Sequence, residues 1–346
     1  MAKEIFDLWG LEEESIDGDI NHYSFTISGD GGVGKSTFAH NLFKRLGGSC
    51  TFGFEDRFKG IGARVVPIDK HGWGAMDKYI TQLERGLKAG KELPFSHVII
   101  DPVGQAGDIC ERYVIEENGW EDMSTMPYGK GYEVFEEEFC GKIDRLRALG
   151  LKVDFVAHGK NETITPPRKE GYVVKMPDIQ KRLKYLVKDS VDFLLYLTVE
   201  RSTDALGNPI AVRRLYMQNY PEFSLKVPLD GFPDYIEWEG DVDEGVDKFI
   251  DAFNKAVEIT REKKGLKTPA KSSSNEPIKV QEDTSSPFEV EEDDIDTLKT
   301  KAVERRDKLL ESMTKQEVAK ILKEELGTVK ISEVEDIDIL KSFVNG

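Results

Sequence analysis

The sequence has no long hydrophobic run, and this absence excludes several classes of protein. No stretch of its 346 residues approaches the roughly 18 uncharged apolar residues that a membrane span requires. Residues 1–7 contain no apolar run of the kind found in a signal peptide. We therefore expect a cytoplasmic protein without a membrane partner.

Cysteine pairs and an excess of positive charge are also missing. The three cysteines, Cys50, Cys110 and Cys140, form no CxxC pair, and no histidine is spaced to complete a zinc site. We interpret them as buried free thiols. The formal net charge of −17 argues against a protein that coats nucleic acid with its whole surface, because such a protein needs a basic face. Any contact with nucleic acid must be made by a local segment of opposite charge.

Strand-like apolar runs alternate with helix-like stretches through most of the chain. This alternation predicts an α/β fold with a mostly parallel central sheet that is covered on both faces. The predicted strands are residues 23–27, 50–54, 97–100, 153–157 and 191–199, and the predicted helices are residues 36–46, 76–88 and 132–149.

Composition changes sharply toward the C-terminus. Eight acidic residues lie between Glu282 and Asp296 with no lysine or arginine among them, which predicts a disordered segment. Thr314 and Glu317 then form a capping box that predicts a short helix. We expect an N-terminal extension over residues 1–19, a globular core over 20–262, a disordered acidic linker over 263–296 and a small helical C-terminal module over 297–346.

The strongest motif is a glycine-rich loop between the predicted strand 23–27 and the predicted helix 36–46. It fits G-x-x-x-x-G-K-[ST] in the context that this motif needs. Backbone N–H groups of such loops surround the phosphates of ATP, the lysine neutralises charge in the transition state, and the serine binds Mg²⁺. The predicted ATP-binding residues are Gly29, Asp30, Gly31, Gly32, Val33, Gly34, Lys35, Ser36 and Thr37.

Two predicted strands end in acidic residues that suit this chemistry. Asp101 follows the apolar residues 97–100 and is the predicted Walker B residue, which holds Mg²⁺ together with Ser36. Glu55 and Asp56 follow residues 50–54, and one of them would polarise the attacking water. Adjacent side chains of an extended chain point to opposite faces, so we expect only one to serve. The sequence leaves the choice open.

The order of phosphate loop, strand with a terminal acid, Walker B strand and a further strand with a polar end resembles the RecA-like recombinase core. More closely, it is similar to the phage nucleotide-binding ATPases of that superfamily, which include the Sak-type single-strand annealing proteins. The resemblance covers roughly residues 24–217. It implies an oligomer that hydrolyses ATP with Mg²⁺ and acts on single-stranded DNA in phage recombination or annealing. It also suggests the cytoplasm of an infected bacterium as the location and a single-stranded-DNA-binding protein as a partner.

The resemblance implies roles for further residues. His158 ends the strand after Walker B and matches the position that senses the γ-phosphate, where recombinases usually carry glutamine. Residues 159–188 match the second DNA-binding loop, and they carry eight basic residues against three acidic ones. Two prolines and Gly171 predict a loop in the first half of this segment. The expected DNA contacts are Lys160, Arg168, Lys169, Tyr172 and Lys175, of which Tyr172 would stack on a base.

Two weaker assignments complete this interpretation. Residues 119–131 match the position of the first DNA-binding loop, with Trp120, Tyr128 and Lys130 as candidate contacts. Arg213 or Arg214 matches the basic residue that RecA-like oligomers insert into the ATP site of a neighbouring subunit, and the sequence does not choose between them.

Three other functions stay open at this point. The chain could be a P-loop motor or loader that acts on a helicase or packaging protein, with the acidic tail and the helical module recruiting that partner. It could also be a small-molecule kinase that uses the same phosphate loop. The third alternative is a binding module that holds a nucleotide as a structural ligand.

Overall fold

The computed structural model describes residues 16–167, 170–203 and 206–265, together with residues 302, 305–306 and 321–323. The chain divides into two compact units, Met1–Ser272 and Ser273–Gly346. The described residues of the second unit are helical, and Ala302 and Leu322 are buried. The predicted linker beyond residue 265, most of the C-terminal module and residues 1–15 of the extension lie outside the described residues.

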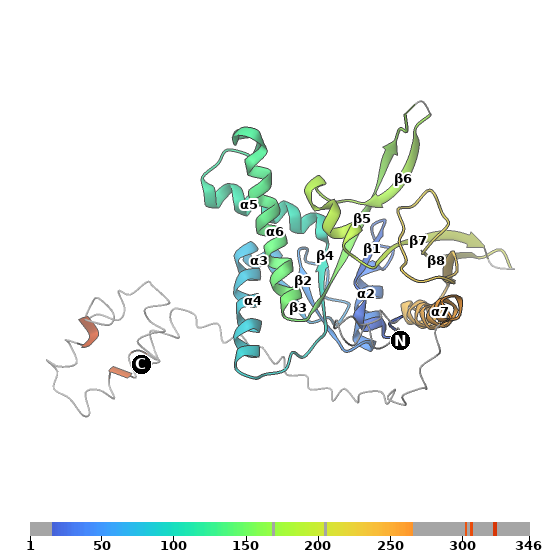
Figure 1. The fold of residues 1–346 in the computed structure, drawn as a ribbon, viewed down its shortest axis with the longest axis horizontal. Coiled ribbons are helices and arrows are strands. Elements are labelled where there is room, and N and C mark those ends of the chain that lie inside the picture. The colour runs from blue at the N-terminus through green and yellow to red at the C-terminus, as the bar shows by residue number, and fades with distance from the viewer. Residues whose placement is uncertain are drawn as a thin grey trace, which may run out of the picture. The chain divides into compact units, whose positions relative to one another are not determined.

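A mostly parallel sheet forms the centre of the first unit (Figure 1). The strand order is β3-β2-β4-β5-β1-β7-β8-β9, and β6 pairs with β5. Strands β3, β2, β4, β5, β1 and β7 are parallel, whereas β6, β8 and β9 run antiparallel to their neighbours. The predicted α/β fold with a mostly parallel sheet is confirmed. The strands are β1 Phe25–Gly29, β2 Ser49–Gly53, β3 Val65–Pro67, β4 His97–Asp101, β5 Lys152–Ile164, β6 Tyr172–Pro177, β7 Phe193–Thr203, β8 Pro209–Tyr216 and β9 Tyr235–Trp238.

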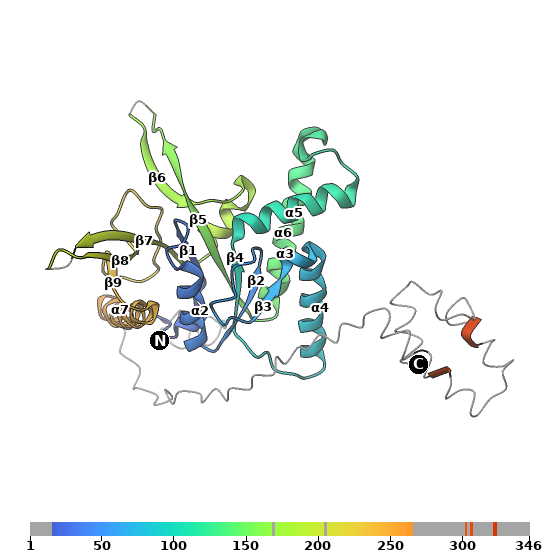
Figure 2. The ribbon, with the colours of Figure 1, turned by 180° about the vertical axis from the view of Figure 1, so that it is seen from behind.

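Helices cover both faces of this sheet (Figure 2). Phe25 and Ile27 of β1 lie in one apolar core with residues of α2 and α7. On the other side, α4, α5 and α6 pack against one another, and α5 and α6 contact β5. The helices are α2 Lys35–Arg45, α3 Ile68–His71, α4 Trp73–Lys88, α5 Val103–Asn118, α6 Lys130–Ala148 and α7 Val242–Lys263, with short η turns at Ile20–His22, Met123–Thr125, Pro127–Gly129, Lys181–Leu183 and Tyr185–Asp189. Among the described residues, no helix combines the length and apolar character needed to cross a membrane.

A buried polar cluster connects the three strands at the middle of the sheet. Asp154 of β5 accepts a hydrogen bond from the backbone N–H of Phe25 in β1 at 2.8 Å. Its other carboxylate oxygen lies 2.7 Å from Nδ1 of His97 in β4, and both side chains are almost fully buried. Burial raises the pKa of Asp154, and the contacts with His97 and Phe25 oppose that rise. The cluster therefore ties β4, β5 and β1 together at the edge opposite Gly29 and Asp101.

The structure corrects the loop predicted after His158. Strand β5 does not end there but runs on to Ile164, and its residues 159–164 pair antiparallel with β6. The segment is therefore a β-hairpin, and in Figure 1 it projects from the sheet. The two prolines and Gly171 fall in its turn, between β5 and β6. This turn is the part of the prediction that holds.

Helix α5 is not among the predicted helices, and its first turns contain two glycines, Gly104 and Gly107. These glycines serve close packing. A Cβ atom at Gly104 would lie 2.8 Å from the carbonyl oxygen of Asp178, and one at Gly107 would lie 2.0 Å from Oε1 of Gln180. Glycine lowers the helix propensity of α5. It also lets the residues after β6 pack directly against the helix.

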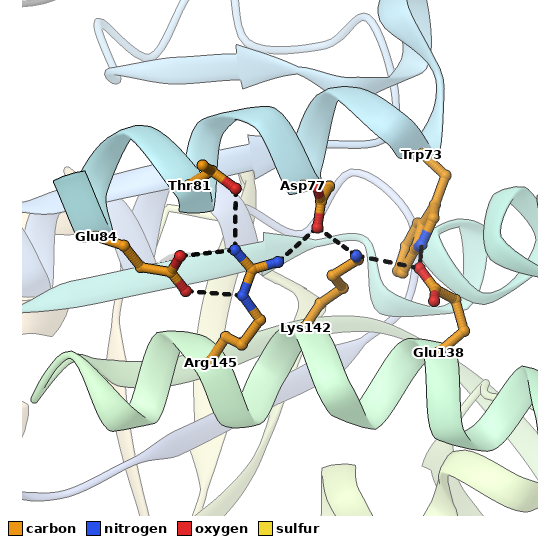
Figure 3. Close-up of polar contacts among 7 residues, drawn as sticks. All are labelled: Trp73, Asp77, Thr81, Glu84, Glu138, Lys142 and Arg145. Carbon is orange, nitrogen blue, oxygen red and sulfur yellow. Dashed lines mark hydrogen bonds and ion pairs between the residues drawn. The ribbon is translucent and has the colours of Figure 1, made fainter.

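A polar network joins α4 to α6 on the outer side of the sheet (Figure 3). Arg145 of α6 donates to both carboxylate oxygens of Glu84, at 2.7 and 2.9 Å, and it also contacts Asp77 and Thr81. Lys142 lies between Asp77 and Glu138, and Glu138 accepts from Nε1 of Trp73 at 2.8 Å. The Trp73 ring packs near Phe54, the residue that precedes Glu55. The network therefore supports the end of β2.

We expect Arg145→Ala to lower the free energy of unfolding by about 1–2 kcal/mol, because it leaves the partly buried carboxylate of Glu84 without its main donor and removes one of the two cations beside Asp77. Urea denaturation of the nucleotide-free protein measures the change. Lys78→Ala, at an exposed position of the same helix, is the control and should have little effect. Equal effects of the two substitutions would contradict a stabilising role for the network.

Candidate active site

The phosphate loop lies between the end of β1 and the start of α2. Gly29 packs so tightly on β7 that a Cβ atom would lie 2.1 Å from the carbonyl oxygen of Leu197. Gly32 and Gly34 have φ angles of 77° and 100°, in the left-handed region that favours glycine. Added Cβ atoms at Gly31 and Gly32 would meet nothing within 4 Å. The loop is therefore tightly packed at Gly29, and the space next to Gly31 and Gly32 is open.

The N-terminus of α2 faces this open space. Its capping residue, Gly34, provides no side-chain hydrogen bond to the first turn. The backbone N–H groups there and the positive end of the helix dipole are consequently suited to a phosphate. This geometry fits the phosphates of ATP.

The side chain of Lys35, the first residue of α2, folds back onto the phosphate loop. Its side chain is buried, and Nζ donates to the backbone carbonyl of Asp30 at 2.7 Å. Burial lowers the pKa of Lys35, and the negative charges of Asp101, Asp30 and Glu55 oppose that effect. The ammonium group is thus placed where a phosphate would supply further negative charge.

Asp101 lies at the end of β4 and is 4% exposed. Burial raises its pKa to about 6, and a hydrogen bond with Ser36 and the charge of Lys35 act in the opposite direction. The structure thus brings a serine oxygen and a carboxylate together beside the phosphate loop. Such hard oxygen ligands, completed by phosphate oxygens and water, fit Mg²⁺. Ser36 and Asp101 are the residues that would hold the ion.

The structure separates the two acids that the sequence left open. Glu55 is mostly buried, its charge influences both Lys35 and Asp101, and Oε1 lies 3.8 Å from Nε2 of His158. Asp56 instead is half exposed and pairs with Lys59 and Lys70, at 3.2 and 3.6 Å. Those lysines hold the pKa of Asp56 below its usual value. Glu55 is therefore the better candidate for the catalytic acid, whereas Asp56 is held by lysines.

His158 reaches the site through the strand order. Its strand, β5, lies between β1 and β4, and His158 pairs in register with Gly29. The residue is therefore level with the start of the phosphate loop and close to Glu55. Its role in sensing the γ-phosphate stays a prediction.

Sequence reasoning missed two residues of this cluster. Arg57 lies 2.9 Å from Glu55, and Tyr196 of β7 donates a hydrogen bond to Oδ1 of Asp30 at 3.2 Å. Tyr196 occupies space that Gly159 leaves, since a Cβ atom there would lie 2.1 Å from its hydroxyl oxygen. No local motif marks Tyr196, because Asp30 is 166 residues away in the sequence. Arg57 could have been predicted from the sequence, because this basic residue directly follows the two candidate acids Glu55 and Asp56.

The predicted DNA contacts differ in their surroundings. Lys160 pairs with Asp178 at 2.8 Å, and Lys175 lies 3.5 Å from Oδ2 of Asp30. Tyr172 is about half exposed on β6, and Tyr128 is fully exposed in the turn before α6. Arg168 and Lys169 lie outside the described residues.

The two candidate arginine fingers point in different directions. Arg214 lies between Glu200 and Glu237, at 2.6 and 2.9 Å, and its guanidinium group covers the ring of Tyr235. Arg213 lies next to Gly34 of the phosphate loop of its own chain. In this structure both side chains therefore contact their own subunit.

A phosphate loop after β1 and the candidate Walker B acid at the end of β4 define a P-loop ATPase. In the sheet β5 alone separates these two strands, and Glu55, just after β2, is the candidate catalytic acid. A family model described as "AAA domain" matches residues 21–227, which is more than half of the chain. The chain belongs to this family of AAA-type P-loop ATPases. No curated protein matches it.

Replacing Lys35 tests this site directly. Lys35→Ala should reduce ATP turnover by on the order of 10³-fold or more, because it removes a charged phosphate contact from the transition state. Released phosphate measures turnover, and circular dichroism checks that the protein is folded. Lys44→Ala, at an exposed position near the end of α2, is the control. A folded Lys35→Ala protein with normal turnover would refute the assignment.

The two acids give a matched pair of substitutions. Glu55→Gln should lower kcat by on the order of 10²-fold or more while ATP still binds, because the amide cannot take a proton from water. Asp56→Asn should leave kcat nearly unchanged, because its side chain is paired with lysines outside the site. Steady-state kinetics of both variants decide the point, and the opposite ranking would reverse their roles.

Proposed function

We propose that this protein is a RecA-like ATPase that acts as a homo-oligomer on single-stranded DNA, in phage recombination or single-strand annealing. One observation carries the proposal. The strand that places His158 beside Glu55 continues without interruption into the projecting β5–β6 hairpin. A change at the nucleotide therefore has a direct structural route to a surface that projects from the sheet.

The chemistry of the proposed reaction rests on residues already described. Lys35 and the uncapped N-terminus of α2 would stabilise negative charge on the phosphates. Mg²⁺, when bound by Ser36 and Asp101, would neutralise further phosphate charge. Glu55 would orient a water molecule and accept its proton, and the nearby His158 and Arg57 would hold the Glu55 carboxylate in place.

The surface of the hairpin has features that suit single-stranded nucleic acid. Tyr172 and Val173 are about half exposed at neighbouring positions of β6. Exposed aromatic rings bind unpaired bases by stacking, with little regard to sequence. Figure 1 places the connection between α5 and α6, which carries Tyr128, toward the same end of the molecule as the hairpin. The two predicted DNA-binding segments therefore share one end of the fold.

The proposal also includes the expected partners and location. A homo-oligomer would align several hairpins along one strand, and a single-stranded-DNA-binding protein would supply the DNA. The same proposal places the protein in the cytoplasm of an infected bacterium. The support for these points is the resemblance of residues 24–217 to the phage ATPases.

A P-loop loader that acts on a helicase or packaging protein is the second candidate. Lys160 and Lys175 favour it, since both pair with carboxylates of their own chain and so have less charge available for DNA. ATPase assays with single-stranded DNA and with a candidate partner protein separate the two functions. Stimulation by DNA alone supports the first, and stimulation by protein alone supports the second.

Salt dependence tests the hairpin as the DNA contact. Arg168→Gln combined with Lys169→Gln should lower the slope of log affinity against log salt by up to about 1.4, at roughly 0.7 for each phosphate contact on a single strand. Adding Lys175→Gln should lower it by a further ~0.7 if Lys175 leaves Asp30 to bind DNA.

Fluorescence anisotropy with labelled single strands, titrated at several salt concentrations, measures the slope. Lys88→Gln combined with Lys91→Gln removes the same charge from exposed positions at and just after the end of α4, and it serves as the control. A slope that changes equally in the two double variants would place the DNA site elsewhere.

His158→Ala should separate DNA binding from hydrolysis. The variant should bind single-stranded DNA as the wild type does, but DNA should no longer change its rate of ATP hydrolysis, because the contact between Glu55 and the hairpin strand is lost. ATPase assays with and without DNA, beside anisotropy titrations, give both quantities. Normal stimulation of the variant by DNA would exclude His158 as the link.

A further inference from the structure

Arg213 of β8 extends to the phosphate loop of its own chain. A Cβ atom built on Gly34 would lie 3.8 Å from Nε of Arg213 and 3.8 Å from Val242 at the start of α7. Gly34 is the residue that caps α2. The guanidinium group therefore lies beside the N-terminus of the helix that is suited to phosphate.

The hydrogen-bond donors of Arg213 are only partly satisfied. Nη1 donates to the carbonyl oxygen of Gly240 at 3.4 Å, a long contact. Nε is buried and has no acceptor within the described part of the chain, and no carboxylate there lies within 4.0 Å of the group. A buried donor without an acceptor is unfavourable. The neighbouring Arg214 shows the contrast, because two carboxylates hold it.

The strand order fixes which end of a nucleotide would reach Arg213. Asp101 ends β4 and Glu55 follows β2. These two strands lie on one side of β1, whereas β8 lies on its other side. The metal ligand and the catalytic acid mark the place of the γ-phosphate. The nucleoside end of a bound triphosphate would then point toward β7 and β8, and the phosphate nearest to Arg213 would be the α-phosphate.

We propose that Arg213 binds the α-phosphate of the nucleotide held by its own chain, as a positioning residue. This contact would supply the missing acceptor of the buried Nε. ATP and ADP share the α-phosphate, so the contact is equally strong with both. Arg213 would therefore strengthen nucleotide binding without favouring the transition state, and its loss should raise KM with little change in kcat. A finger acting on a neighbouring subunit would have the opposite signature.

Titration of a fluorescent ADP analogue onto the full chain tests the proposal. Arg213→Gln should weaken ADP binding by on the order of tenfold or more, the usual range for a charged hydrogen bond, and should raise KM for ATP by a similar factor. Arg213→Lys, which keeps the charge, should recover part of the affinity. Arg201→Gln, at an exposed position of β7, should bind ADP as the wild type does.

A mixing experiment distinguishes the two directions of action. Lys35→Ala protein should be inactive but carries an intact Arg213, so it would restore turnover to Arg213→Gln protein if the arginine acted on a neighbour. We expect no such rescue. Rescue on mixing, or a loss of kcat with unchanged ADP affinity, would overturn the proposal. Wild-type protein that fails to bind ADP would instead refute the nucleotide site itself.

Discussion

The buried carboxylate of Asp154 is the interaction on which the arrangement of the site depends. It lies on β5 and bonds to the backbone of β1 and to His97 of β4, so that three neighbouring strands meet at one side chain. A buried charge is costly unless every oxygen finds a donor, and here the donors come from two different strands. A shift in register of either neighbour would leave one oxygen of this carboxylate without its partner.

The same three strands carry the chemistry at their opposite ends. Gly29 opens the phosphate loop after β1, Asp101 ends β4, and His158 lies on β5 in register with Gly29. Parallel strands end at a common edge, so fixing their register at one edge also fixes the distances between these residues at the other. The site is therefore precise although its members come from segments far apart in the sequence.

Strand β5 belongs both to the central sheet and to the hairpin. Its first half belongs to the central sheet, and from Gly159 onward it pairs with β6 in the projecting hairpin. Asp30 adds a second link, because this phosphate-loop residue contacts Tyr196 and Lys175, the latter on β6. Nucleotide chemistry and the hairpin surface are thus connected through a strand and through a set of side chains. This connection is the physical basis of the proposed effector role of the hairpin.

The sequence by itself determined the α/β class, the phosphate loop and the Walker B acid, because each depends on local order along the chain. Strand, glycine loop and helix follow one another around Lys35, and an apolar run ends at Asp101. The tertiary structure decided the contacts between residues that lie far apart in the sequence. It separated Glu55 from Asp56 through their different partners, and it continued the strand of His158 into a hairpin because β6 was available to pair with it. It also placed Tyr196 and Arg213 near the phosphate loop, since only the strand order of the folded sheet puts β7 next to β1 and β8 next to β7.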